Sequence, residues 1–254
     1  MSSPNSTQRF SDRVDNYVRY RPGYPDGIMK LLRVRCGLTP QARIADIGFG
    51  TGIFTQMLLE NGNSVFGIEP NQEMREAGEK LLVEYPNFRS VGATAENTTL
   101  EGRSVDFITA AQAAHWFDRE RARREFVRIL RPGGWVALIW NERLTQGTPF
   151  LAEYEDLLLK HGTDYGEVRH ERTTDVISEF FAPGPFELET FRTQQAFDFP
   201  GLEGRVFSSS YIPASSDPRS VPLRHALRDL FERCKVNDTV AFDYDTKVFF
   251  GRLS

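Results

Sequence analysis

The chain has 254 residues, 40% hydrophobic and 26% charged, which is the composition of a globular protein with enough apolar bulk for a core. Its net charge of −4 and isoelectric point of about 5.7 disfavour nucleic acid as the main partner, because a phosphate backbone rewards a basic surface. The two cysteines are far apart in the sequence and no metal-ligand spacing occurs, so we expect neither a disulfide framework nor a metal site. No stretch reaches the roughly 18 apolar residues of a membrane span, so we expect no membrane partner.

The opening of the chain combines a polar end with an aromatic and basic segment. Residues 1–8 lack the apolar core of a signal peptide, so we expect a cytoplasmic protein, either a monomer or a homodimer. Residues 10–24 are rich in tyrosine and arginine, and a helix is predicted near residues 26–36. This N-terminal segment, residues 1–40, is either a lid over the rest of the chain or a surface helix whose tyrosines fix it to the domain.

From Ala42 onward, short apolar runs alternate with segments of helical periodicity. The runs are apolar nearly throughout, as expected for parallel strands that are covered on both faces. Their alternation with helices predicts a parallel sheet with right-handed crossovers. The predicted strands are residues 43–47, 64–68, 88–91, 105–111 and 134–140, and the predicted helices between them are residues 51–60, 71–84 and 118–130.

After Asn141 the pattern changes. Two predicted strands now alternate charged with apolar residues, and an aromatic and serine-rich stretch lies between them. No linker-like composition and no internal repeat is present, so we predict one α/β domain with a helical cover. The strands are residues 186–197 and 240–253, the helices are residues 149–160, 174–181 and 219–234, and the aromatic stretch is residues 201–212.

The most informative segment is a glycine-rich turn after the first strand. Asp46 is followed by Gly48, Gly50 and Gly52, and a helix opens directly afterwards. Glycine at every second position lets the backbone turn tightly and approach a ligand at the switch point of an open sheet. The spacing differs from the GxGxxG of dinucleotide-binding proteins, because Ile53 takes the sixth position. A carboxylate this close to the turn repels a pyrophosphate and favours a cationic ligand such as S-adenosylmethionine, which carries an ammonium and a sulfonium.

Three further strands of the predicted sheet end in polar or distinctive residues. Glu69 ends the second strand, where a carboxylate can accept hydrogen bonds from both ribose hydroxyls. Residues 93–96 follow the third strand, where an adenine edge would lie, and residues 111–117 follow the fourth. Any one of these segments could be only a turn, but four at successive strand ends together predict a single ligand site.

These residues resemble the class I S-adenosylmethionine-dependent methyltransferases. Residues 17–25, 46–52 and 111–118 are similar to the small-molecule group that includes trans-aconitate methyltransferase. The resemblance implies an α/β fold with a doubly wound, seven-stranded and mostly parallel sheet, whose last strand is antiparallel, with helices on both faces and a helical lid. It implies one methyltransferase domain over residues 1–254, in which residues 1–40 form the lid, 42–142 bind the cofactor, and 143–254 complete the sheet and cover the substrate.

The resemblance also distributes roles among residues. The turn surrounds the methionine part of S-adenosylmethionine, Glu69 binds its ribose, and residues 94–96 lie near adenine, with Glu96 where many relatives have Asp. The cofactor-binding candidates are Tyr17, Arg21, Asp46, Gly48, Gly50, Gly52, Glu69, Pro70, Thr94, Ala95, Glu96 and Gln112. The substrate-binding candidates are Tyr20, Tyr24, His115, Trp116 and Asn141, and Arg21 and Arg143 are the cations available for an acidic acceptor.

The expected function is methyl transfer to a small-molecule acceptor by in-line displacement. A carboxylic acid is one acceptor class, and it needs no general base because it is already ionised. His115 is the candidate base for other acceptors, since histidine titrates near neutral pH, and its alternative role is packing beside Trp116.

Two other functions remain to be weighed. Residues 112–115 read Gln-Ala-Ala-His, which lacks the Asn/Asp-Pro-Pro-aromatic motif of adenine-amino methyltransferases, and neither cysteine follows a proline as in cytosine-carbon enzymes. A non-catalytic module that binds S-adenosylmethionine as a sensor stays open on sequence grounds.

Overall fold

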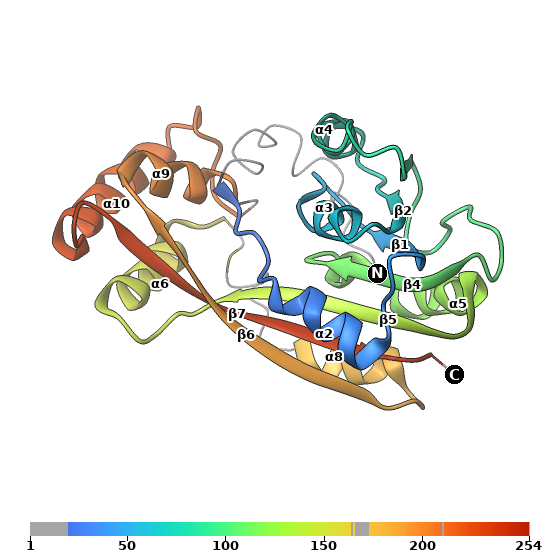
Figure 1. Ribbon diagram of the computed structural model, residues 1–254. Coiled ribbons are helices and arrows are strands. Elements are labelled where there is room, and N and C mark those ends of the chain that lie inside the picture. Colours follow the sequence, from blue (N-terminus) through green and yellow to red (C-terminus); the bar gives the residue numbers. More distant parts are fainter. Residues whose placement is uncertain (1–19, 164, 166–172, 210, 254) are drawn as a thin grey trace.

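The computed structural model describes residues 20–163, 165, 173–209 and 211–253 (Figure 1). A seven-stranded sheet runs through the molecule in the order β3-β2-β1-β4-β5-β7-β6. The strands are β1 (Arg43–Ile47), β2 (Ser64–Ile68), β3 (Phe88–Val91), β4 (Val105–Ala111), β5 (Leu130–Arg143), β6 (Phe186–Phe197) and β7 (Val240–Gly251).

The first five strands are parallel to one another, and β7 lies antiparallel between β5 and β6. The predicted closing pair of an otherwise parallel sheet is therefore confirmed. The strand order reverses at β1, which has β2 on one side and β4 on the other. Loops that leave the carboxyl ends of β1 and β4 therefore diverge and leave room for a ligand between them.

Helices cover both faces of the sheet. On one face, α5 (Arg119–Ile129) and α8 (Thr173–Phe181) contribute Phe126 and Phe180 to a first hydrophobic core. On the other face, α2 (Gly27–Cys36) and α3 (Ile53–Glu60) contribute Leu32 and Leu58 to a second core. Ile44 of β1 belongs to the second core, whereas Ala45 and Ile47 belong to the first, so β1 contributes to both cores. Two further elements are α4 (Gln72–Leu81) and the short 3-10 helix η2 (Ala114–Trp116).

A third hydrophobic core lies at the other end of the molecule. It is enclosed by α6 (Pro149–His161), α9 (Phe199–Phe207), α10 (Ser220–Cys234) and the adjoining parts of β6 and β7, and we call this part the cover. In Figure 1 the cover lies at the left, and the arrow of β4 points towards it. The carboxyl ends of the parallel strands therefore face the cover.

The largest differences from the sequence prediction are α9 and the two ends of β5, which begins at Leu130 although the prediction placed its start at residue 134. Helix α9 was not predicted, because its two glycines and one proline give it poor intrinsic helix propensity. Tertiary packing sustains it, since Leu202 and Val206 are buried in the third core and the Asp198 side chain accepts a hydrogen bond from the Gly201 N–H. Strand β5 also extends three residues past Trp140, where it pairs with β7. Among the described residues, no helix is long and apolar enough to cross a membrane.

Candidate functional site

The glycine-rich turn joins β1 to α3 at the point where the strand order reverses. Gly48, Gly50 and Gly52 all have positive φ, at 70°, 57° and 87°. The Gly48 N–H donates to the carbonyl of Ile68 on β2 at 2.7 Å. A Cβ at position 48 would lie 2.5 Å from the Cβ of Ala113, so the turn passes directly against the loop that follows β4. Only glycine fits this left-handed and closely packed position.

Phe49 anchors the turn from within. Its ring is buried against two glycines, because a Cβ at Gly67 of β2 or at Gly78 of α4 would lie 2.7 Å or 2.5 Å from it. The ring also makes an edge contact with Phe88 at 5.4 Å between centroids. Sequence reasoning treated this residue only as a spacer between glycines, although Gly67 and Gly78, lying within a strand and a helix, were a signal of close packing.

Asp46 lies behind the turn and is only 1% exposed. Its two carboxylate oxygens accept hydrogen bonds from the hydroxyls of Thr55 on α3 and Thr109 on β4, at 2.6 and 2.7 Å. Burial raises the pKa of Asp46 to about 6 and outweighs these two hydrogen bonds, which lower it. In this structure Asp46 therefore ties three elements together, and its contact with a cofactor stays a prediction.

Glu69 holds the turn from the neighbouring strand. Its carboxylate accepts hydrogen bonds from the Gly50 N–H at 3.1 Å and from the Asn71 N–H at 2.9 Å. Burial raises the pKa of Glu69, against the lowering effect of these N–H donors. Pro70, which follows, is exposed. The acid predicted to bind ribose thus stands at the edge of the turn, and each oxygen keeps a further lone pair for a hydroxyl donor.

The segment predicted near adenine follows β3. Ala95 is buried, Thr94 is exposed and forms an isolated bridge with Asn97, and Glu96 accepts a hydrogen bond from the Asp118 N–H at 2.8 Å. Glu96 therefore joins this segment to the start of α5.

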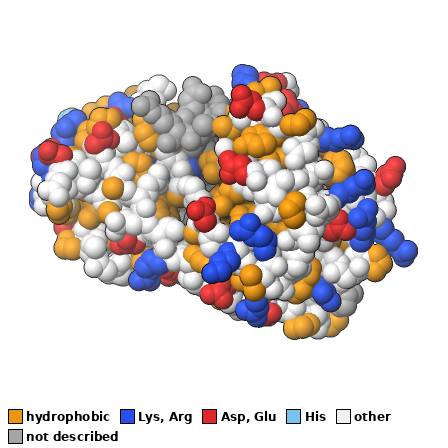
Figure 2. Space-filling model, in the orientation of Figure 1, with side chains coloured by type: hydrophobic (Ala, Val, Ile, Leu, Met, Phe, Trp, Pro, Cys, Tyr) orange, Lys and Arg blue, Asp and Glu red, His pale blue; other side chains and the backbone are white. Residues whose placement is uncertain are grey.

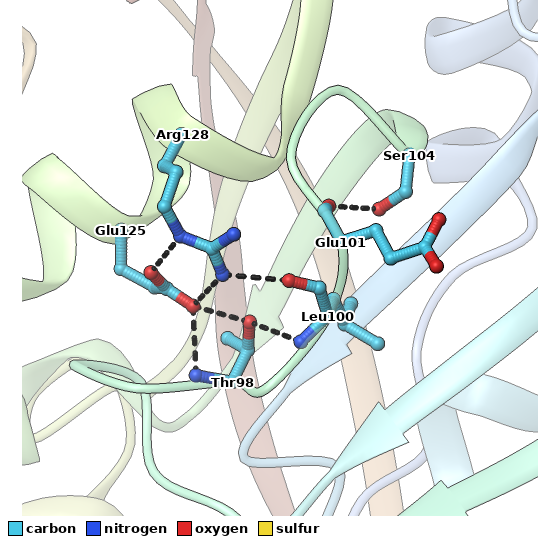
Figure 3. Close-up of polar contacts among 6 residues, drawn as sticks. All are labelled: Thr98, Leu100, Glu101, Ser104, Glu125 and Arg128. Atoms are coloured by element: carbon cyan, nitrogen blue, oxygen red, sulfur yellow. Dashed lines mark hydrogen bonds and ion pairs between the residues drawn. The ribbon is translucent and has the colours of Figure 1, made fainter.

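An ion pair between the buried Glu125 and the half-exposed Arg128 fixes the rest of this loop (Figure 3). Glu125 accepts hydrogen bonds from both the N–H and the hydroxyl of Thr98 and from two nitrogens of Arg128, which also donates to the Leu100 carbonyl at 2.7 Å. Arg128 holds the pKa of Glu125 well below its usual range, at about 2. These bonds fasten the loop after residues 94–96 to α5.

Gln112 connects the end of β4 to β5. It is a non-glycine residue with φ of 56°, which is uncommon and is often seen at functional sites. Its side-chain amide donates to the Asn141 carbonyl at 2.9 Å. The Asn141 amide in turn donates to the Gly23 carbonyl at 3.1 Å, and its oxygen accepts from the Thr246 hydroxyl at 2.6 Å. Gln112 and Asn141, both predicted site residues, therefore lie side by side at the ends of β4 and β5.

His115 and Trp116 lie in η2, directly after this junction. The His115 side chain is exposed and its ring lies 4.8 Å from that of Trp116 between centroids. This placement leaves His115 accessible at the strand ends and also fits the packing role beside Trp116.

The N-terminal segment crosses from the cover to the sheet. Tyr20 packs against Gly204 of α9, where a Cβ would lie 2.1 Å from its ring, and Arg21 donates to the Ser208 carbonyl at 3.2 Å. Tyr24 makes an edge contact with Phe54 of α3 at 5.1 Å between centroids. Tyr17, the other predicted tyrosine, lies outside the described residues.

A small pocket of about 200 Å³ lies beside this segment. Its lining is residues 22–25, residues 193–195 of β6 and Tyr244 of β7. On the face seen in Figure 2 the surface is hollowed between the cover and the side that carries α3 and α4, and hydrophobic side chains show there. The N-terminal segment thus contacts both sides of the molecule next to the predicted site.

The first prediction concerns Gly48→Ala, with Gly133→Ala as its control. Gly133 also has a positive φ, of 81°, but nothing lies within 4 Å of a Cβ there. Both variants should lose about 1–2 kcal/mol of unfolding free energy from left-handed strain. Gly48→Ala should lose about 1–3 kcal/mol more, because its methyl overlaps Ala113. Urea unfolding measures the difference, and equal losses would contradict this packing.

The second prediction concerns the pH dependence of Asp46. Because its folded-state pKa of about 6 exceeds the ordinary 3.8, the folded protein binds more protons between these values, and stability falls as pH rises through that window. Relative to wild type, Asp46→Asn should gain about 2–3 kcal/mol of unfolding free energy between pH 4 and pH 7. Asp156→Asn, at an exposed aspartate, is the control. Parallel pH curves for wild type and Asp46→Asn would contradict the assignment.

The comparisons with known proteins agree with this geometry. Residues 45–138 match a family model described as a methyltransferase domain, and this range runs from β1 into β5 and includes every strand end discussed above except Asn141. An uncharacterized methyltransferase of Mycobacterium tuberculosis is 39% identical over 136 residues, which cover 53% of this chain and 52% of that protein. The chain thus spans about half the length of the curated relatives it matches.

Solved structures share the fold over most of the chain. A candidate type II methyltransferase of Anaeromyxobacter dehalogenans superposes with a TM-score of 0.67 at 22% identity, covering 92% of this chain and 98% of that one. A second solved structure is phospholethanolamine N-methyltransferase 2 of Haemonchus contortus, in complex with phosphomonomethylethanolamine and S-adenosylhomocysteine. It superposes with a TM-score of 0.57 at 14% identity, and the match covers 97% of this chain and 58% of that one. Residues 45–138 thus match a methyltransferase-domain model, and the chain shares its fold with these two solved structures.

Proposed function

We propose that this protein transfers the methyl group of S-adenosylmethionine to a small-molecule acceptor, with a carboxylic acid as the favoured class. The observation that carries the proposal is the turn of Gly48, Gly50 and Gly52 at the switch point, braced by the carboxylate of Glu69. The methyltransferase-domain match over residues 45–138 supports it.

The residues around the turn fit this cofactor. The left-handed glycines let the turn fold tightly at the switch point, and Glu69 offers acceptor lone pairs for the ribose hydroxyls. Asp46 and Glu69 are both buried acids with raised pKa values, so a ligand with positive charge relieves their mutual repulsion. We assign residues 94–96 to the adenine side and keep Gln112 among the residues that bind the cofactor.

When bound, S-adenosylmethionine supplies a methyl group on a sulfonium that is already a good leaving group. The chain's own task is to hold the acceptor in line and to exclude water, and positioning of this kind lowers a barrier by ~7–11 kcal/mol in favourable cases. We assign the positioning to Asn141 and to the N-terminal segment of residues 20–25, which contacts both the cover and α3.

The third prediction concerns the cofactor. Thermal unfolding with S-adenosylmethionine or S-adenosylhomocysteine at 100 times the dissociation constant should show about 2.7 kcal/mol of added stability, a midpoint rise on the order of 5–10 °C. NAD should give no rise, because the turn lacks the dinucleotide spacing. A rise with NAD alone would require the methyltransferase proposal to be dropped.

Turnover separates the enzyme from a sensor module. With saturating S-adenosylmethionine, release of S-adenosylhomocysteine should appear with at least one member of a panel of small carboxylic acids and hydroxyl compounds. Binding of the cofactor without turnover across the whole panel would favour the non-catalytic sensor.

The fourth prediction concerns His115→Asn. With a carboxylate acceptor kcat should fall less than about tenfold, since the acceptor is already ionised and needs no general base. Steady-state kinetics against pH measure this, and Asp118→Asn, a neighbouring exposed substitution, controls for local disturbance. A fall of about 10²–10⁴-fold would instead make His115 the base.

A further inference from the structure

The cover contains a buried guanidinium group that no sequence pattern indicated. Arg205 of α9 is 6% exposed. Its Nε donates to the Tyr244 hydroxyl at 3.4 Å and its Nη1 donates to the Ser209 hydroxyl at 3.2 Å, so both partners are neutral. Among the residues that the structure describes, no carboxylate lies within ion-pair distance of Arg205, and its Nη2 donates to none of them.

The buried acid of the cover already has an ion-pair partner. Of the buried acids that the structure describes, only Glu155 belongs to the cover. It forms an ion pair with Arg143, and the Tyr165 hydroxyl donates to it at 2.7 Å. The pair of Arg143 and Glu155 is therefore neutral as a unit, and in the part of the chain that the structure describes it leaves Arg205 without a carboxylate of its own.

The positive charge of Arg205 affects the pKa of a neighbouring tyrosine. Burial alone would raise the pKa of Tyr211, but the charges of Arg205, Arg21 and Arg143 lower it below its ordinary value. Tyr244 and Tyr154 also border Arg205 and are buried. A buried cation surrounded by neutral hydroxyls is costly for stability, because burying a charge is compensated only by an opposite charge and good hydrogen bonds.

The position of Arg205 points towards the acceptor side of the proposed site. The register places Tyr244 opposite Arg143 of β5 and Thr193 of β6. Arg143 lies two residues beyond Asn141 and so on the same face of β5. Tyr244 also lines the pocket of about 200 Å³ beside the N-terminal segment. Arg205 therefore lies in the layer directly behind the strand ends, on the side of the cover.

We propose that Arg205 binds a carboxylate of the methyl acceptor. This inference rests on the proposed function and names the chemical class of its substrate. A guanidinium presents planar N–H donors that match the two oxygens of a carboxylate, and Arg205 still has donors to give. Arg205 has no carboxylate partner among the described residues, and its single positive charge matches one carboxylate, whereas a phosphate dianion would leave a negative charge buried.

The fifth prediction tests this with succinate and glutarate, their neutral diamides, and methyl phosphate. Binding is measured by calorimetry at saturating S-adenosylhomocysteine. The dicarboxylates should bind more tightly than their diamides and than methyl phosphate. Arg205→Met should weaken dicarboxylate binding at least about tenfold, as expected for loss of a charge-assisted hydrogen bond. Arg205→Lys keeps the charge and loses the planar donors, and it should also weaken binding.

Arg233→Met is the matched control, because Arg233 also lies in the cover but pairs with Glu153 at the surface, 2.5 Å away. It should bind the dicarboxylates as wild type does. All variants should bind S-adenosylhomocysteine equally. In the absence of ligand, Arg205→Met should have a higher melting temperature than wild type, since it removes an uncompensated buried charge.

Three results would overturn the proposal. They are equal binding of dicarboxylates and diamides to wild type, tighter binding of methyl phosphate than of the dicarboxylates, and undiminished dicarboxylate binding by both Arg205 variants. If S-adenosylhomocysteine itself fails to bind, the proposed function fails first and the role of Arg205 falls with it. Retained S-adenosylhomocysteine binding in any of these three results would leave the cofactor assignment in place.

Discussion

The hydrogen bond from the Gly50 N–H to the Glu69 carboxylate is the contact on which the rest of the site depends. It joins the turn after β1 to the end of β2, and it is possible only because the glycines adopt positive φ. With the turn fixed in this way, α3 begins at Ile53 and the loop after β4 packs against Gly48 through Ala113. One backbone donor thus couples the two loops that diverge at the switch point.

Buried charged side chains lie on both sides of the molecule. Asp46 and Glu69 are buried acids beside the turn, and burial raises the pKa of each. Arg205 is a buried cation in the cover, which faces the strand ends. Buried charged groups of this kind reduce the stability of the fold, and they are typical of functional sites, where a bound ligand of opposite charge stabilises them. This distribution of buried acids beside the turn and a buried cation in the cover supports the proposal of a cationic methyl donor and an anionic acceptor.

Sequence periodicity predicted the parallel strands well, because a strand covered on both faces is a continuous apolar run with few alternatives. The bounds of β1, β2, β3 and β4 match residue for residue. The cover was harder to predict, since α9 forms through packing against the third core and its own residues favour a helix weakly. Arg205 was therefore missed, while Arg143, the cation proposed for an acidic acceptor, proved to be paired with Glu155.

The N-terminal segment explains how the two sides could act as one site. Tyr20 contacts α9 immediately beside Arg205, and Tyr24 contacts α3 immediately after the glycine turn. Between them Gly23 accepts a hydrogen bond from Asn141, at the end of β5. Residues 20–24 therefore link α9 of the cover to α3 and to the end of β5 through contacts at both ends. Under the proposed function, these contacts would help to hold an acceptor in line and to exclude water, which methyl transfer requires.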